Sequence, residues 1–239
     1  MKTLFIVSTP IGNLQDITVR AMKTLFSVDL VLAENTTKTS ILIDQLMKTY
    51  PEITGTKKPK LISFNEYEEP IKISEAMNYL MEYDVALVSS AGTPVISDPG
   101  FKLVIEAYKN GVKVVTIPGP SAVVSSISIS GLPSDKFIFV GFLNKSIVKK
   151  TKFLQNLKTA LETMGKNKIF PTVIAYESPH RLFETLNAIK AVYGNITIVL
   201  TRELTKIHEE RICDKVENVL SFLPQKPLGE YCVMFNLKN

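Results

Sequence analysis

Short apolar segments alternate with segments of helical period along the first half of the chain, and this alternation is what most constrains the fold. Apolar runs span residues 4–8, 28–33, 59–64, 84–89 and 112–117. Between them, apolar residues recur every three or four positions, as on one face of a helix. A strand–helix–strand order favours parallel pairing with right-handed crossovers. Strands that are nearly all apolar fit a sheet covered on both faces. The first half is therefore predicted to be a parallel α/β domain.

The second half repeats this alternation. Strands are predicted over residues 136–142, 171–176, 195–200 and 230–237, with helical segments between them. Residues 201–212 form a charged stretch to which we assign neither helix nor strand. The turn-rich PGPSA segment separates the two halves. We therefore expect an α/β fold with two domains, residues 1–118 and 119–239, each a mainly parallel or mixed sheet flanked by helices.

The composition argues against a membrane protein and a metal protein. No apolar run approaches the ~18 residues of a membrane span, and the first apolar segment is shorter than a signal-peptide core of ~7–15 residues. We therefore expect a cytoplasmic protein with no membrane association. Cys213 and Cys232 lie far apart without a CxxC spacing, so we expect buried thiols. His180 and His208 are two separated residues, which do not make a metal site.

Positive charge is concentrated in the second half. Residues 1–130 carry 12 basic and 13 acidic side chains, whereas residues 131–239 carry 16 basic and 10 acidic ones. The stretch KSIVKKTKFLQNLK at 145–158 has five lysines and no acid. Such a cluster fits a polyanionic partner, and it equally fits a solvated lysine-rich helix face.

Residues with unusual turn chemistry follow most of the predicted strands. These segments read STPIGN, AENTT, SSAGTPVISDPG, PGPSA, YESPHR and TRELT in chain order. In open parallel sheets, ligands bind beyond the carboxyl ends of the strands. Neither GxGxxG nor GxxxxGK[ST] is present, so the loops carry no signature for a dinucleotide or for ATP. Glu34 lies where a ribose-binding acid would be, but without the glycines a solvated loop acid explains it as well.

Taken together and in order, these motifs resemble the tetrapyrrole-methylase superfamily. Within it, they are most similar to the branch that methylates a ribose 2′-oxygen, most often of a cytidine, in small-subunit ribosomal RNA. The resemblance covers nearly the whole chain. It implies two α/β domains with S-adenosylmethionine bound in the cleft between them, usually in a homodimer. It also implies ribosomal RNA or the small ribosomal subunit as the partner.

The resemblance places the cofactor against loops from both halves. Backbone groups of Thr93 and Ile96 are expected to contact it, with Gly92 and Pro94 shaping the turn. The full set of implied cofactor positions is Ile11, Gly12, Thr93, Ile96, Ser121, Ala122, Tyr176, Glu177, Leu204 and Glu230.

A ribose hydroxyl is a poor nucleophile, so a general base is expected to contribute roughly 10²–10⁴-fold. Candidates for this base are Glu34, Glu203 and Glu209. Arg202 or Lys206 is expected to hold a phosphate or to stabilise the developing alkoxide. The alternative for Glu203 and Arg202 is an ion pair within their loop.

The lysine-rich segment supplies the expected RNA contacts, Lys149, Lys150 and Lys152, with Arg181 added from the YESPHR motif. Replacing these lysines is expected to weaken RNA binding and flatten its salt dependence.

The chain departs from the family in three motifs. The usual AEDTR reads AENTT, SDAGTP reads SSAGTP and FHEHNE reads FNEYEE, which places Asn35, Thr37, Ser90, Asn65 and Tyr67 at the changed positions. These changes remove charged and proton-transferring groups from the loops. Two alternatives stay open: a methyltransferase of the same fold that acts on a small molecule such as a tetrapyrrole, and an RNA-binding relative that has lost catalysis.

Overall fold

The computed structural model describes residues 2–238, and the chain divides into two compact units between Ser121 and Ala122. Each unit contains one sheet and its own apolar core. The expected domain boundary at residue 118 falls in the same turn-rich segment as this division.

The first unit is built on a parallel sheet, as the alternation predicted. Its strands pair in the order β3-β2-β4-β1-β5, and every pairing is parallel. The strands are β1 (Thr3–Val7), β2 (Leu30–Ala33), β3 (Lys60–Ser63), β4 (Val85–Val88) and β5 (Lys113–Ile117). The two strands β2 and β4 are buried along their whole length. Parallel pairing brings the carboxyl ends of these strands to one edge of the sheet.

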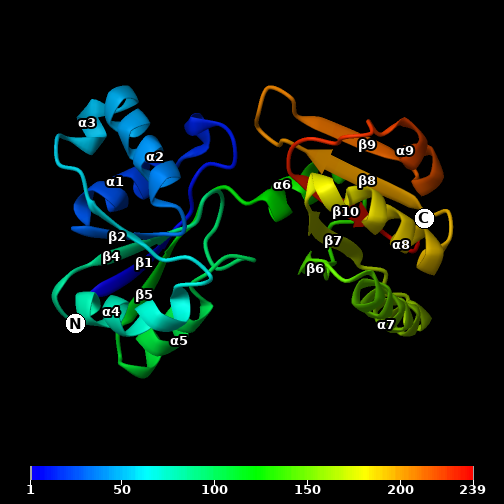
Figure 1. Cartoon of the computed structure of the whole chain (residues 1–239), viewed down its shortest axis with the longest axis horizontal. Coiled ribbons are helices and arrows are strands. Elements are labelled where there is room, and N and C mark those ends of the chain that lie inside the picture. Colours follow the sequence, from blue (N-terminus) through cyan, green and yellow to red (C-terminus); the bar gives the residue numbers. More distant parts are fainter. Residues whose placement is uncertain (1, 239) are drawn as a thin grey trace. The chain divides into compact units, whose positions relative to one another are not determined.

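Helices cover both faces of this sheet (Figure 1). One face carries α1 (Val19–Ser27), α2 (Thr36–Thr49) and the short α3 (Pro51–Thr54), and the other carries α4 (Glu69–Glu82) and α5 (Phe101–Lys109). Each face has its own apolar cluster. Side chains of β2 alternate between the clusters, with Val31 in the first and Leu32 in the second. The all-apolar strands therefore have buried partners on both sides.

Two helix ends show how local chemistry sets the element boundaries. Asp16 lies in a 3₁₀ turn, Leu14–Asp16, and Thr18 caps α1 by accepting a hydrogen bond from the Ala21 N–H at 3.0 Å. Gly111 ends α5. It adopts φ +68°, and the next residue donates to the Ala107 carbonyl, which completes a Schellman motif.

The second unit contains a mixed sheet with the order β6-β7-β10-β8-β9. Strand β6 (Phe137–Phe142) is parallel to β7 (Thr172–Glu177), and the other pairings are antiparallel. The remaining strands are β8 (Thr197–Arg202), β9 (Glu210–Lys215) and β10 (Tyr231–Phe235). Strand β9 begins inside the charged stretch to which no element was assigned. It lies at the sheet edge, where polar side chains are compatible with strand pairing.

Helices also cover both faces of the second sheet. Apolar side chains of α7 (Ile147–Lys166), α8 (Leu182–Tyr193) and α9 (Val216–Phe222) share one core cluster, and those of α6 (Ala122–Ser130) contribute to another. A 3₁₀ turn, Pro179–Arg181, precedes α8. Cys232 is buried as expected, whereas Cys213 is exposed on β9, which corrects that expectation. Within residues 2–238, no helix combines the length and apolarity that a bilayer crossing requires.

Candidate functional site

In the first unit, the loops after β1, β4 and β5 are joined by hydrogen bonds at one edge of the sheet. The Thr93 hydroxyl donates to the Pro120 carbonyl at 3.0 Å, so Ser8 is the donor in the 3.0 Å contact between the Ser8 and Thr93 hydroxyls. Thr9 and Gly92 exchange two main-chain hydrogen bonds of 2.9 and 3.0 Å. The loops that the sequence singled out therefore form one connected structure.

The loop after β4 follows a strained, closely packed path. Gly92 adopts φ +80°, and a Cβ atom there would lie 3.3 Å from Cγ2 of Ile11. Val95 and Ser97 also have positive φ, at 75° and 63°. Such conformations cost about 1–3 kcal/mol each for residues other than glycine and are retained where the surroundings fix them. Ile96, between them, points an exposed side chain outward.

The same edge presents both apolar surface and an unpaired hydroxyl. Ile11 is buried beneath the loop and Gly12 is exposed. The buried Thr9 Oγ1 has no hydrogen-bond partner within the described residues. A buried hydroxyl without a partner is costly unless a ligand or water completes it. This edge of the sheet therefore has the features of a ligand site.

Two carboxyl groups lie at this edge. Oε2 of Glu34 accepts a hydrogen bond from the Ser90 main-chain N–H at 2.7 Å. Burial, and then the charge of Glu34, raise the pKa of Asp98 to about 7, although a hydrogen bond from Ser89 opposes the shift. Sequence reasoning missed Asp98, because its proximity to Glu34 depends on how the sheet brings two loops together. A carboxyl that titrates near neutrality is suited to proton transfer.

Two of the positions that depart from the family motifs start helices. Oδ1 of Asn35 accepts from the Lys38 N–H at 3.0 Å and caps α2. Oδ1 of Asn65 accepts from the N–H groups of Tyr67 and Glu68 at 3.1 and 3.0 Å, just before α4. Asparagine caps helices about as well as aspartate, so the change at Asn35 removes charge without removing the local structure.

In the second unit, a cluster of two carboxylates and one lysine follows β8 and precedes β10. Nζ of Lys206 lies 3.0 Å from Oε1 of Glu203 and 3.4 Å from Oε2 of Glu230. Burial tends to raise the pKa of Glu203, but the hydrogen bonds from Lys206 and the Glu230 main chain outweigh it and lower the pKa. A carboxylate held in this way is a weak proton acceptor at neutral pH.

The neighbouring residues in this loop are also engaged. Arg202 forms its ion pair with Glu210, at 3.5 Å, and its Nε is buried without a partner among the described residues. An ion pair between Arg202 and Glu203 was the alternative expectation. Instead, Arg202 pairs with Glu210, and Glu203 pairs with Lys206. Glu209 accepts from the Thr205 N–H at 2.5 Å, and Leu204 is buried.

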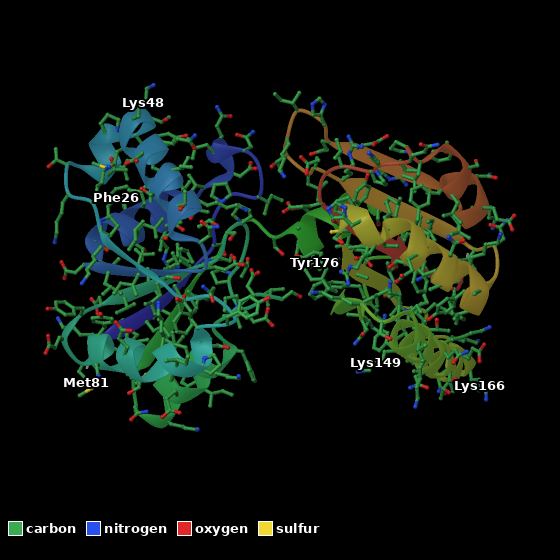
Figure 2. All side chains as sticks on the ribbon, in the orientation of Figure 1. Phe26, Lys48, Met81, Lys149, Lys166 and Tyr176 are labelled. Atoms are coloured by element: carbon green, nitrogen blue, oxygen red, sulfur yellow. The ribbon has the colours of Figure 1, made fainter. Side chains whose placement is uncertain are left out.

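The carboxyl end of β7 combines an aromatic cluster with a buried carboxylate. The Tyr176 ring, labelled in Figure 2, packs against Phe139 and Phe142 with ring centroids 4.8 and 5.4 Å away. The Glu177 carboxylate is buried and faces the interior, where it pairs with Arg181 at 2.7 Å. Its side chain is thus satisfied by the protein, and its expected contact with a cofactor stays a prediction for its main chain.

Two further expected cofactor residues, Ser121 and Ala122, are half-buried where the two units divide. Within residues 2–238, no group of three metal-ligating side chains comes together.

The expected RNA-contacting lysines of α7 separate into two groups. Lys149 and Lys152 are exposed, and Figure 2 shows Lys149 and Lys166 projecting from the helix. Lys150 is buried, with Nζ 2.5 Å from Glu184 and 2.9 Å from the Thr185 hydroxyl. Its assignment as an RNA contact is therefore corrected. Neighbouring residues of a helix lie on different faces. The sequence prediction grouped the lysines of this segment without assigning each of them to a face.

The family model for Tetrapyrrole (Corrin/Porphyrin) Methylases matches residues 3–219. The chain belongs to this family of methylases.

The chain is also similar to individual named proteins and solved structures. The chain is 43% identical to "Ribosomal RNA small subunit methyltransferase I" of Thermotoga maritima, over 100% of both chains. Among solved structures, it resembles a diphthine synthase, with a TM-score of 0.66 and 15% identity over 98% of this chain and 90% of the other. It also resembles the Thermus thermophilus uroporphyrin-III C-methyl transferase complexed with S-adenyl homocysteine, with a TM-score of 0.62 and 13% identity over 98% and 97% of the chains. These two structures support the fold.

Proposed function

We propose that this protein is an S-adenosylmethionine-dependent methyltransferase that modifies small-subunit ribosomal RNA. We further propose that the accepting group is a ribose 2′-hydroxyl, with a cytidine as the expected nucleotide. The observation that carries the proposal is the full-length similarity to a relative named as a small-subunit ribosomal RNA methyltransferase, at 43% identity. The connected loops at the edge of the first sheet supply a site of matching chemistry.

The residues at this edge fit the methyl donor. The donor combines a cationic sulfonium, an apolar adenosyl group and a zwitterionic amino-acid group. Ile11 and Ile96 offer apolar surface, and the orphaned Thr9 hydroxyl offers a hydrogen bond. When bound, S-adenosylmethionine supplies an activated methyl group. The protein then contributes mainly orientation, which can supply roughly 7–11 kcal/mol.

The remaining assigned positions complete the proposed donor site. Main-chain groups of the loop after β4 and the segment after β5 are proposed to contact the donor in the first unit. In the second unit, Tyr176 and the turns carrying Leu204 and Glu230 are proposed to contact it. The position of the donor between the two domains stays a prediction. In the first unit, Thr93 and Ile96 are proposed to contact it through their main chains, together with Ile11, Gly12 and Ser121.

We assign proton acceptance to the Glu34–Asp98 pair. Glu34 is fixed by the Ser90 N–H, and the pKa of Asp98 is raised to about 7 by burial and by the charge of Glu34. Glu203 is less suited, because its pKa is lowered within the Lys206 cluster. The unpaired Nε of Arg202 leaves this residue as the candidate for a substrate phosphate or a developing alkoxide.

The exposed lysines of α7 are the proposed RNA surface. Lys145, Lys149 and Lys152 are exposed near the start of this helix, where Val148 is exposed as well. The phosphate backbone attracts such a group through counterion release, without reading sequence.

We also propose that the protein acts as a homodimer in the cytoplasm, where ribosomal subunits are assembled. Phe101, Ile105 and Tyr108 form an exposed apolar stripe on α5, a surface of the kind that subunit contacts cover. Light scattering after size-exclusion chromatography tests this: Tyr108→Lys is expected to convert a dimer to a monomer, and a monomeric wild type would contradict it.

The substrate is tested by incubating the protein with S-adenosylmethionine labelled in the methyl group. Separate reactions contain immature small ribosomal subunits, free ribosomal RNA, or tetrapyrrole precursors. We expect label in RNA and none in tetrapyrrole. Label in tetrapyrrole would instead establish a small-molecule enzyme, and donor binding without transfer to any substrate would establish a relative that has lost catalysis.

A further inference from the structure

A network of charged and polar groups runs through the interior of the second unit, from α7 to the carboxyl end of β7. It begins at Lys150, whose side chain is fully buried. Nζ of Lys150 donates to Oε1 of Glu184 at 2.5 Å and to Oγ1 of Thr185 at 2.9 Å. The Thr185 hydroxyl in turn donates to Oε2 of Glu177. One hydroxyl thus links a buried lysine to a buried carboxylate.

The network continues from Glu177 to the loop that follows β6. Oε1 of Glu177 accepts from the Ser178 N–H at 2.8 Å and pairs with Arg181 at 2.7 Å. Arg181 also donates to the Leu143 carbonyl at 2.9 Å, and its guanidinium lies 5.8 Å from the centre of the Phe142 ring. Both oxygens of the Glu177 carboxylate are therefore occupied by internal donors. Its role is to hold neighbouring segments together.

The far end of this network contacts the aromatic residue assigned to the donor site. Phe142 packs against the ring of Tyr176, and Tyr176 directly precedes Glu177 in β7. Buried ion pairs contribute little net stability, but they demand a single geometry, because an unpaired buried charge is costly. The charges therefore favour one arrangement of the Phe142–Tyr176 pair.

We infer that Lys150 and Thr185 are positioning residues for the methyl donor, acting through Glu177 and Arg181 on Tyr176. The inference rests on the proposed function, because it takes Tyr176 as a donor contact. It gives the buried lysine of α7 a role distinct from that of its exposed neighbours. Lys149 and Lys152 govern RNA affinity, whereas Lys150 governs donor affinity.

The sharpest variant is Thr185→Val, which removes the hydroxyl and keeps the shape of the side chain. We expect its affinity for S-adenosylhomocysteine, measured by calorimetry, to fall about tenfold, as for the loss of a hydrogen bond to a charged group. The KM for ribosomal subunits and the salt dependence of RNA binding should be unchanged. Thr185→Ser, which restores the hydroxyl, should recover the donor affinity.

Lys158→Met provides a matched control. Lys158 also joins α7 to α8, by donating to the Val192 carbonyl at 3.0 Å, but it takes no part in the network. This variant should bind the donor as the wild type does. Equal loss in Lys158→Met and Thr185→Val would show that general helix packing, and not the network, sets donor affinity, and would overturn the inference.

A second measurement does not depend on the donor. The ring resonances of Tyr176 in protein with ¹³C-labelled tyrosine, assigned with Tyr176→Phe, should shift in Thr185→Val and stay in place in Lys158→Met. A folded Thr185→Val protein with wild-type donor affinity and an unshifted Tyr176 would overturn the inference. If the wild type failed to bind the donor, the proposed function would fail, while a shifted Tyr176 would still support the positioning network.

Discussion

The main-chain N–H of Ser90 donates a 2.7 Å hydrogen bond to Oε2 of Glu34, which fastens the loop after β4 to the residue that follows β2. The Glu34 carboxylate thus has two functions that can be tested separately. As a hydrogen-bond acceptor it holds the loop, and as a base it is proposed to take a proton. A change from carboxylate to amide removes the second function and keeps the first.

Glu34→Gln is therefore expected to retain donor binding and to lose catalysis. If Glu34 is the base, the single-turnover rate of methyl transfer should fall by roughly 10²–10⁴-fold. Calorimetry should show little change in the affinity for S-adenosylhomocysteine. Glu34→Ala, which also loses the hydrogen bond from Ser90, should weaken both. Full activity in Glu34→Gln would place the base elsewhere, with Asp98 the next residue to test.

The raised pKa of Asp98 predicts a specific dependence of stability on pH. Burial and then the charge of Glu34 move this pKa from 3.8 to about 7. Between these values the folded protein binds more protons than the unfolded chain, so this group makes stability decrease as the pH rises. Asp98→Asn should raise the melting temperature at pH 8 and leave it nearly unchanged below about pH 3, where the wild-type carboxyl is protonated in both states. Equal melting temperatures of the two proteins at pH 8 would contradict the assignment.

The exposed lysines of α7 are expected to bind RNA through its phosphates. Lys149→Ala with Lys152→Ala should weaken RNA binding, and the slope of log K against log salt should become shallower by about 1–2, since each phosphate contact contributes ~0.7–0.9. Lys166→Ala with Lys168→Ala is the matched control, at and just beyond the far end of α7, where Lys166 lies about 25 Å along the helix from Lys149. If both double variants changed the slope equally, the RNA surface would not be confined to the start of α7.

Glu203 is expected to act on stability more than on catalysis. Its pKa is lowered by Lys206 and by the Glu230 main chain, against the effect of burial. The stabilisation is therefore present above its ordinary pKa of 4.5 and lost as the pH falls through the lower folded value. Glu203→Gln should lower the melting temperature at pH 7, by an amount that shrinks as the pH falls below 4.5, and should keep most of the methyl-transfer rate. A rate loss like that of Glu34→Gln would return the role of base to Glu203.

The sequence predicted the elements better than it predicted the partners of polar residues. Apolar runs such as β4 fold as expected, because burial on both faces selects them almost independently of context. Strand β9 was missed because an edge strand needs few apolar residues.

Lys150 was misassigned for a different reason. Its partners, Glu184 and Thr185, lie on another helix, and only the packing of α7 on α8 brings them together. The same holds for Asp98 and Glu34, whose mutual effect arises when two loops meet at one sheet edge. Polar networks of this kind depend on tertiary contacts, which periodicity does not encode.

The most direct test of the central claim is the position of the transferred methyl group in RNA. A methylated 2′-oxygen can no longer attack the adjacent phosphate, so the RNA chain resists alkali at that nucleotide. After transfer from methyl-labelled S-adenosylmethionine to small ribosomal subunits and alkaline hydrolysis of the RNA, we expect the label in a single uncleaved dinucleotide whose methylated member is a cytidine. Label recovered only in mononucleotides would place the methyl group on a base and contradict the proposed ribose chemistry.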